Sequence, residues 1–145
     1  MRVDFYHLTA APLERVLPSI CEKVLASGER LLLVAGAAHL ARLDELLWTY
    51  AADSFLPHAR REAGKCETQP VLLSDTPEPL NGATNIALAD SVWREEALAF
   101  ARTFYFFDDD RVEPARANWR ALSKRSDVEA RYWKQDERGR WAQSA

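Results

Sequence analysis

The sequence predicts an α/β fold: a single domain over residues 1–145 with three layers, α/β/α, around a mostly parallel central sheet. Residues Arg2–His7 alternate, with Val3 and Phe5 on one side, as is typical of a strand. Residues Arg30–Ala35 contain the apolar run LLLVA, which favours a strand buried on both faces of a parallel sheet. Helical patterns follow both segments, and this β-α-β-α order favours right-handed crossovers between parallel strands.

The helix between these strands is expected from Pro12 to Ser27, because apolar residues recur at helical spacing and Gly28 provides a C-terminal stop. Its apolar face comprises Leu13, Val16, Leu17, Ile20 and Val24. Proline lacks a backbone N–H and clashes with the preceding turn, so Pro18 is expected to kink or divide this helix.

The second helix lies in a segment that combines a core-facing stripe with a displaced tryptophan, Arg42 to His58, RLDELLWTYAADSFLPH. The stripe consists of Leu40, Leu43, Leu46, Leu47 and Tyr50. At about 100° per residue, Trp48 projects about 140° from the centre of that stripe, toward solvent. A tryptophan in this position is a candidate anchor for another protein, because it offers a large contact area with little rotamer entropy to lose.

Phe55 follows Trp48 by seven residues, and the next two residues, Leu56 and Pro57, predict an aliphatic knuckle because proline interrupts the regular backbone. We expect Phe55 beside Trp48 in one apolar surface patch. The alternative is that both aromatic side chains pack under a neighbouring loop of the same domain.

The rest of the chain continues the alternation of strands, loops and helices. Polar residues from Ala59 to Pro70 predict an exposed loop. Strands are expected over Val71–Ser74, Asn85–Ala89, Arg102–Phe107 and Ala130–Gln135, with a further strand at Arg140–Trp141 after the turn DERG. Helices are expected over Val92–Ala99 and Val112–Arg125, the latter preceded by three aspartates that favour a helix N-terminus.

The last helix carries two patterns that together indicate a binding groove. Trp119 shares a stripe with Val112, Ala115 and Leu122, which is expected to face the sheet. Arg116, Arg120 and Lys124 recur at i, i+4 and i+8 and form a basic row beside that stripe. Arg116 adjoins the apolar stripe, a position suited to a carboxylate, so an acidic peptide with an apolar last side chain fits. The alternative is an ordinary solvated face paired with local acids.

Composition and charge limit the function classes. The chain has 48% hydrophobic residues and a net charge of −3, so its surface as a whole does not attract nucleic acid. Cys21 and Cys66 stand far apart and predict two buried, reduced thiols rather than a zinc site or a disulfide. With no apolar run long enough to cross a bilayer, and no apolar core in MRVDFYHLTA, we expect a cytoplasmic protein.

Motifs for enzymatic chemistry are missing from the sequence. The turns after the first two expected strands read HLTAAP and GAAH, and neither contains a glycine-rich phosphate-binding loop. The three histidines are scattered without metal-ligand spacing, and no G-x-S-x-G elbow is present. These gaps leave an enzymatic activity without support from the sequence, and we expect no cofactor and no metal.

Several short stretches, in one order along nearly the whole chain, resemble the chi subunit of bacterial DNA polymerase III, part of the clamp-loader complex. They are FYHL at 5–8, PLERVLP at 12–18, RLDELLW at 42–48, SFLPH at 54–58, QPVLLS at 69–74, ARANW at 115–119 and YWKQDERGRW at 132–141. The resemblance implies a nucleotide-binding-like α/β fold without a phosphate-binding loop. It also implies a non-catalytic adaptor that links the clamp loader to single-stranded DNA-binding protein and reaches DNA only indirectly.

The resemblance also implies two partner surfaces. The acidic, phenylalanine-ended C-terminal tail of single-stranded DNA-binding protein would dock on the last helix, where Arg116 and Trp119 match residues of the family's site. A second basic position of that site is Val112 here, so either Arg111 or Arg120 supplies the missing charge or the tail binds more weakly. Lys124 lies further along the same row. The psi subunit of the clamp loader would bind the surface formed by Trp48, Phe55, Leu56 and Pro57.

Two rival functions belong to other classes. One is a small nucleotide-dependent or hydrolytic α/β enzyme whose motifs are lost or disguised. The other is direct binding of single-stranded DNA through the basic row and nearby aromatic residues, which would be weak and sensitive to salt on an acidic domain.

Overall fold

The protein is described by a computed structural model covering residues 1–50 and 56–144. Its strands are β1 (Arg2–His7), β2 (Leu31–Val34), β3 (His58–Arg60), β4 (Val71–Ser74), β5 (Asn85–Leu88), β6 (Arg102–Phe107), β7 (Glu129–Gln135) and β8 (Trp141–Gln143). The α-helices are α1 (Leu13–Ala26), α2 (Ala37–Thr49) and α3 (Val112–Ser123). Four 3-10 helices are η1 (Arg61–Ala63), η2 (Cys66–Thr68), η3 (Glu95–Ala99) and η4 (Asp109–Arg111).

All eight strands form one sheet in the order β3-β4-β2-β5-β6-β1-β7-β8. Every neighbouring pair is parallel except β7 and β8, which form an antiparallel hairpin at one edge. The central strands β2, β4 and β5 are buried along their whole length, as strands covered on both faces must be. This arrangement confirms the predicted α/β fold with a mostly parallel sheet.

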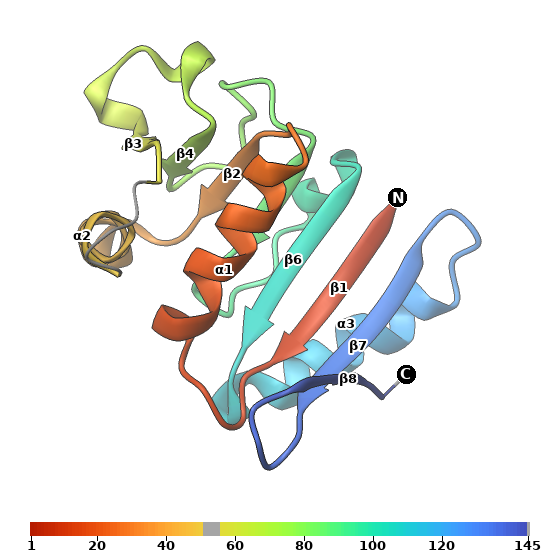
Figure 1. Ribbon diagram of the computed structural model, residues 1–145. Coiled ribbons are helices and arrows are strands. Elements are labelled where there is room, and N and C mark those ends of the chain that lie inside the picture. The colour runs from red at the N-terminus through yellow and green to blue at the C-terminus, as the bar shows by residue number, and fades with distance from the viewer. Residues whose placement is uncertain (51–55, 145) are drawn as a thin grey trace.

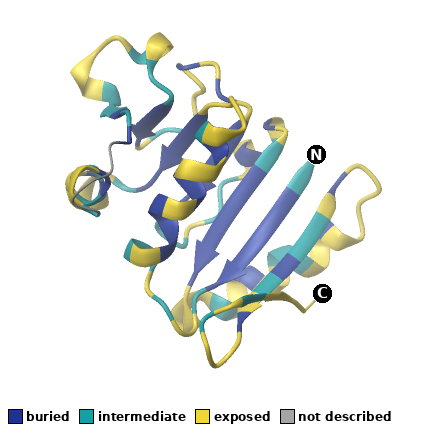
Figure 2. Cartoon of the chain, viewed as in Figure 1, coloured by how far each residue is buried: buried dark blue, intermediate teal, exposed yellow. Residues whose placement is uncertain are grey.

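Helices lie on both faces of the sheet (Figure 1). On one face α1 and α2 pack over Tyr6, Leu31, Leu33 and Phe104, and on the other face α3 and η3 pack over Phe5, Tyr105 and Phe107. Figure 2 shows the consequence in α1, whose buried and exposed residues alternate around the helix while the strands behind it are buried.

The structure corrects several details of the sequence interpretation. The segment expected as a loop from Ala59 to Pro70 begins inside a strand, because His58–Arg60 pairs with β4. β3 is an edge strand that needs only one ladder of backbone hydrogen bonds, so its sequence requires no apolar run. The helix expected over Val92–Ala99 is only the 3-10 turn η3, because Asp90 and Arg94 hold the preceding residues in a tight turn.

Two further expectations were wrong in part. Pro18 does not divide α1, which runs unbroken through this buried proline. Of the two free cysteines, Cys21 is buried as expected, whereas Cys66 is only half-buried. Burial raises the pKa of the Cys21 thiol to about 12, which keeps it protonated at neutral pH.

A buried carboxylate joins three neighbouring strands. Asp4 on β1 is fully buried, and its oxygens accept hydrogen bonds from Arg102 Nε on β6 at 2.9 Å and from Trp133 Nε1 on β7 at 2.9 Å. Arg2 Nε lies 3.0 Å from the same carboxylate. The bonds replace the water that burial removes, and they fix the register of β1 against both neighbours.

We expect Asp4→Ala to lower the free energy of unfolding by about 2 to 4 kcal/mol, because it leaves the buried indole N–H and two guanidinium groups without their acceptor. Urea-induced unfolding followed by circular dichroism measures the difference. Asp110→Ala, which removes an exposed carboxylate, is the control and should cost less than about 0.5 kcal/mol. A loss below about 1 kcal/mol for Asp4→Ala would show that the buried carboxylate contributes little.

Alkaline pH should destabilise the protein through two buried tyrosines. Burial raises the pKa of Tyr6 and of Tyr105 to about 12, above the value of about 10 in an unfolded chain. The neutral phenols therefore favour the folded state fully below about pH 10, and this contribution is lost as pH rises toward about 12. We expect a loss of about 1 kcal/mol per tyrosine by about pH 11, measured by urea unfolding. An equal loss of stability in the Tyr6→Phe/Tyr105→Phe variant, which lacks both titrating hydroxyls, would contradict this.

Candidate functional site

A cavity of about 390 Å³ lies between α3 and the ends of β1 and β7. It is lined by His7, Arg116, Trp119, Arg120, Tyr132, Lys134 and Ser144, and we call it the α3 cavity. Trp119 and Tyr132 meet edge to face, with ring centroids 6.2 Å apart, and form its aromatic floor. An apolar side chain of a ligand is therefore able to exchange water for aromatic contacts here.

Positive side chains border this aromatic floor. Arg116 is about half exposed, and its Nη1 lies 3.6 Å from Glu113 Oε1 in a long, solvent-screened ion pair. Arg120 and Lys134 are exposed at the same cavity from α3 and β7. Arg116 keeps guanidinium N–H groups for a carboxylate, which an arginine can bind through two parallel hydrogen bonds.

The Trp119 indole lies with its N–H inward. Its Nε1 atom is buried and has no hydrogen-bond partner among the described residues. A buried donor without an acceptor costs about 1 to 3 kcal/mol. Because Trp119 follows Arg116 by one turn of α3, the aromatic wall and the guanidinium stand side by side.

His7 and Tyr132, which both line the α3 cavity, belong to a hydrogen-bonded row of side chains. His7 is buried, with Nε2 2.7 Å from Asp109 Oδ1 and Nδ1 3.4 Å from the Tyr132 hydroxyl. Burial raises the pKa of Tyr132, while the nearby positive charge of Arg116 lowers it in part. The phenol is protonated at neutral pH, with its hydroxyl beside His7 Nδ1 and within the influence of the Arg116 charge.

The structure brings together part of the basic row predicted from sequence. Arg116, Trp119 and Arg120 all line the α3 cavity, whereas Lys124 is the C-cap of α3 and Arg111 is its N-cap, and neither lines it. Sequence reasoning did not find His7, Tyr132, Lys134 and Ser144. These residues reach the α3 cavity through the pairing of two strands, because His7 on β1 lies opposite Lys134 on β7. Only a prediction of that pairing would have found them.

Trp48 is the centre of the second surface predicted from the sequence. Its side chain is 52% exposed, and its ring lies 4.5 Å from the His58 imidazole, which is buried and bonded to Leu56 O and to Asp44. Phe55 lies outside the described residues. Leu56 is 2% exposed and belongs to the core, so it supports this surface from beneath instead of forming it. Pro57 is half-buried.

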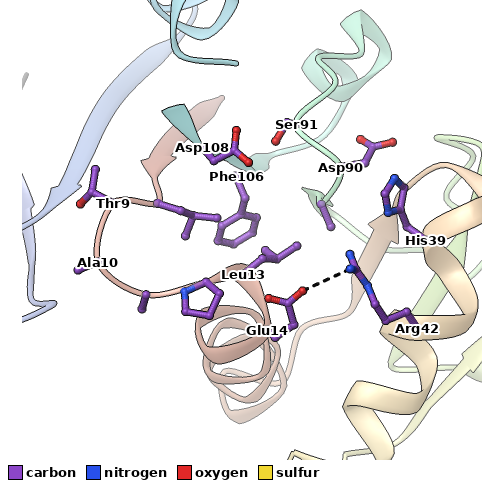
Figure 3. A pocket seen from close by; sticks show the side chains of 14 residues that line it. Thr9, Ala10, Leu13, Glu14, His39, Arg42, Asp90, Ser91, Phe106 and Asp108 are labelled. Carbon is purple, nitrogen blue, oxygen red and sulfur yellow. Dashed lines mark ion pairs between the residues drawn. The ribbon is translucent and has the colours of Figure 1, made fainter. Parts of the chain in front are cut away.

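A further cavity of about 500 Å³ lies at the carboxyl ends of β1, β5 and β6, beside α2 (Figure 3). In α/β folds this edge is where nucleotides commonly bind, with phosphates on the amides of the strand-to-helix turns. Here the amides of Thr9, Ala10 and Ala11 donate to Gln135 Oε1 at 3.3, 3.0 and 3.0 Å. The protein's own side chain thus occupies the oxygen position at the first turn.

An internal oxygen occupies the second turn as well. The Gly36 amide, at the N-cap of α2, donates to Asp90 Oδ2 at 2.8 Å. Burial of Asp90 would raise its pKa, but hydrogen bonds from Arg94 and Gly36 outweigh burial and hold the pKa below its ordinary value. The resulting carboxylate repels a phosphate, in agreement with the absence of phosphate-binding motifs in the sequence.

The described residues contain no group of three or more histidine, cysteine or acidic side chains placed to hold a metal ion. Among the helices described, none has the length and apolar character required to cross a membrane.

The chain is similar in sequence to a known family. The sequence model of the family described as "DNA polymerase III chi subunit, HolC" matches residues 1–129. The matched part includes the whole of α3 and ends as β7 begins, so Tyr132, Lys134 and Ser144 lie beyond it. No protein with a curated description matches the chain.

The exposure of Trp48 yields a stability prediction. We expect Trp48→Ala to lower the free energy of unfolding by less than about 1 kcal/mol, because half of the side chain already contacts water. Leu47→Ala is the matched control on the same helix, and it should cost about 2 to 5 kcal/mol because Leu47 is 1% exposed. Urea unfolding compares the two. A loss above about 2 kcal/mol for Trp48→Ala would identify it as a core residue.

Proposed function

The chain belongs to the DNA polymerase III chi subunit family, and we propose that it is a non-catalytic adaptor that binds the acidic C-terminal tail of single-stranded DNA-binding protein in the α3 cavity. The observation that carries the proposal is the juxtaposition of an aromatic floor, Trp119 and Tyr132, with the cations Arg116, Arg120 and Lys134. The bound tail would connect the replicative polymerase to DNA that is coated by single-stranded DNA-binding protein.

The chemistry of the tail fits the α3 cavity in three respects. A terminal phenylalanine matches the aromatic floor, and burial of its ring would contribute about 1.5 to 3 kcal/mol. The terminal carboxylate matches the half-exposed guanidinium of Arg116. The acidic residues before it match Arg120 and Lys134, which attract them over a longer range.

Lys134 offers a positive charge in place of the one that the family usually has at the position of Val112. Val112, at a usually basic position, is half-buried at the first turn of α3. Arg111 lies at the N-cap outside the α3 cavity, whereas Lys134 reaches it from the neighbouring strand β7. We therefore assign the compensating charge to Lys134 and Arg120.

The second half of the adaptor would be the surface around Trp48. We propose that it binds the psi subunit of the clamp loader, or the protein that takes its place, through the exposed Trp48 ring and the adjoining Pro57. Trp48→Ala should then abolish capture of this partner while the tail peptide still binds, because α2 and α3 lie on opposite faces of the sheet.

The central experiment is titration with an acidic, phenylalanine-ended peptide by calorimetry. We expect Arg116→Ala to weaken binding by about 1.5 to 3 kcal/mol, roughly tenfold to a hundredfold or slightly more, because a bidentate hydrogen bond to the carboxylate is lost. Arg42→Ala is the matched control: this exposed helical arginine also has one long ion pair, 3.7 Å to Glu14, but it lies outside the α3 cavity. Unchanged affinity for Arg116→Ala would place the tail elsewhere.

Companion titrations separate the parts of the site. Arg120→Ala and Lys134→Ala should each cost less than Arg116→Ala, and Lys124→Ala least, because Lys124 does not line the α3 cavity. Added salt should weaken binding without abolishing it, since the phenylalanine contributes an apolar part. Amidation of the peptide's C-terminus should remove most of the Arg116 effect. Equal affinity for the amidated peptide would contradict recognition of the terminal carboxylate.

A further inference from the structure

The face of the sheet opposite α3 carries a second groove. Two adjoining cavities of about 420 and 470 Å³ share the lining residues Arg2, Tyr6, Ile20, Lys23 and Arg102. They run between α1 and the strands β6, β1 and β7, where no helix lies in front of β1 and β7 (Figure 1). We call this continuous depression the α1 groove.

The α1 groove is positively charged although the chain as a whole is acidic. Arg15 and Lys23 border it from α1, and Arg2 and Arg102 border it from the strands. Glu29 is the one acidic residue among the lining residues, and it is hydrogen-bonded to an asparagine side chain. Among the described residues Arg15 and Lys23 have no ion-pair partner, so their charges face solvent uncompensated.

Asp4 holds the two strand arginines in place beneath the α1 groove. Arg102 reaches the carboxylate through Nε, and Arg2 reaches it through Nε and Nη2. One carboxylate therefore serves two guanidinium groups, which leaves a net positive charge and further N–H groups at each arginine. Arg102 is held a second time, because its Cζ lies 4.3 Å from the centre of the Phe104 ring. Fixed guanidinium groups of this kind bind phosphate with little loss of conformational entropy.

Aromatic side chains form the wall opposite α1. Trp133 and Trp141, both half-buried, line the α1 groove from β7 and β8. Trp133 is fixed by its hydrogen bond to Asp4, and Trp141 packs edge to face on Tyr6 at 5.1 Å. Bases of any sequence bind to such rings, and cations beside the rings bind the backbone.

We propose that the α1 groove binds single-stranded nucleic acid, with phosphates on Arg2, Arg102, Lys23 and Arg15 and a base against Trp133 or Trp141. Arg15 and Lys23 are eight residues apart on one helix, about 12 Å, so the cations are spaced for a polyanion instead of a single ion. This goes beyond the proposed adaptor role, in which DNA is reached through another protein. The α3 cavity lies on the opposite face, so both ligands fit at once.

The test uses the full chain and a fluorescein-labelled oligothymidylate of about 12 nucleotides, with anisotropy measured at about 50 mM salt. The double variant Arg15→Ala/Lys23→Ala should lower affinity at least tenfold. It should also reduce the slope of log affinity against log salt by about 1.4, the value for two phosphate contacts on a single strand. Its affinity for the acidic tail peptide should equal that of the parent, which separates this result from any failure of the adaptor proposal.

Arg120→Ala/Lys124→Ala removes the same charge from the other face and should leave oligonucleotide binding unchanged. A larger loss in this control than in Arg15→Ala/Lys23→Ala would move the nucleic acid to α3 and overturn the proposal. Trp141→Leu should lower the affinity for the oligonucleotide at least fivefold. An abasic strand of equal length should bind the Trp141→Leu variant and the parent with equal affinity. Displacement of the oligonucleotide by polyglutamate of equal charge at equal concentration, or no binding by the parent, would also overturn it.

Discussion

The arrangement of side chains on both faces of the sheet depends on the hydrogen bonds that the buried Asp4 carboxylate requires. A buried charge of this kind costs several kcal/mol unless its oxygens are bonded, so β1 is held where Arg102 on β6 and Trp133 on β7 both reach it. Side chains alternate along a strand. The interaction that places Asp4 and Tyr6 toward α1 therefore also places Phe5 and His7 toward α3. A shift of β1 by one residue would exchange the two faces and destroy the aromatic packing on each.

Charge is distributed unevenly in this acidic protein, and the distribution gives each face a separate capacity. The α3 cavity places Arg116, Arg120 and Lys134 beside an aromatic floor, which suits one short acidic peptide with an apolar end. The α1 groove spreads its cations over a longer path and holds two of them on a shared carboxylate, which suits a repeating polyanion. Because the α3 cavity and the α1 groove lie on opposite faces of β1 and β7, a ligand in one would leave the other accessible.

Features that depend on local sequence pattern could be predicted, whereas features that depend on the order of strands in the sheet could not. Arg116, Trp119 and Arg120 belong to one helix, so helical phase alone placed them together, and the same argument correctly left Trp48 exposed. Tyr132, Lys134 and His7 entered the site through the pairing of β1 with β7, which are separated by more than a hundred residues and whose adjacency no local period encodes. The edge strand β3 was missed because it pairs with β4 alone, so its sequence needs no apolar run that would mark it as a strand. The burial of Leu56 was missed because it comes from packing against residues that are distant in the sequence, which the local pattern does not encode.

The side chain of Gln135 holds the β1–α1 turn in one conformation. Three backbone amides converge on its side-chain oxygen, in the geometry that other α/β proteins offer to a diffusing phosphate. A tethered oxygen is present at a high and constant effective concentration, whatever the metabolic state of the cell. The turn therefore keeps one conformation through rises and falls in nucleotide levels. A turn held in this way has its final conformation before any ligand arrives.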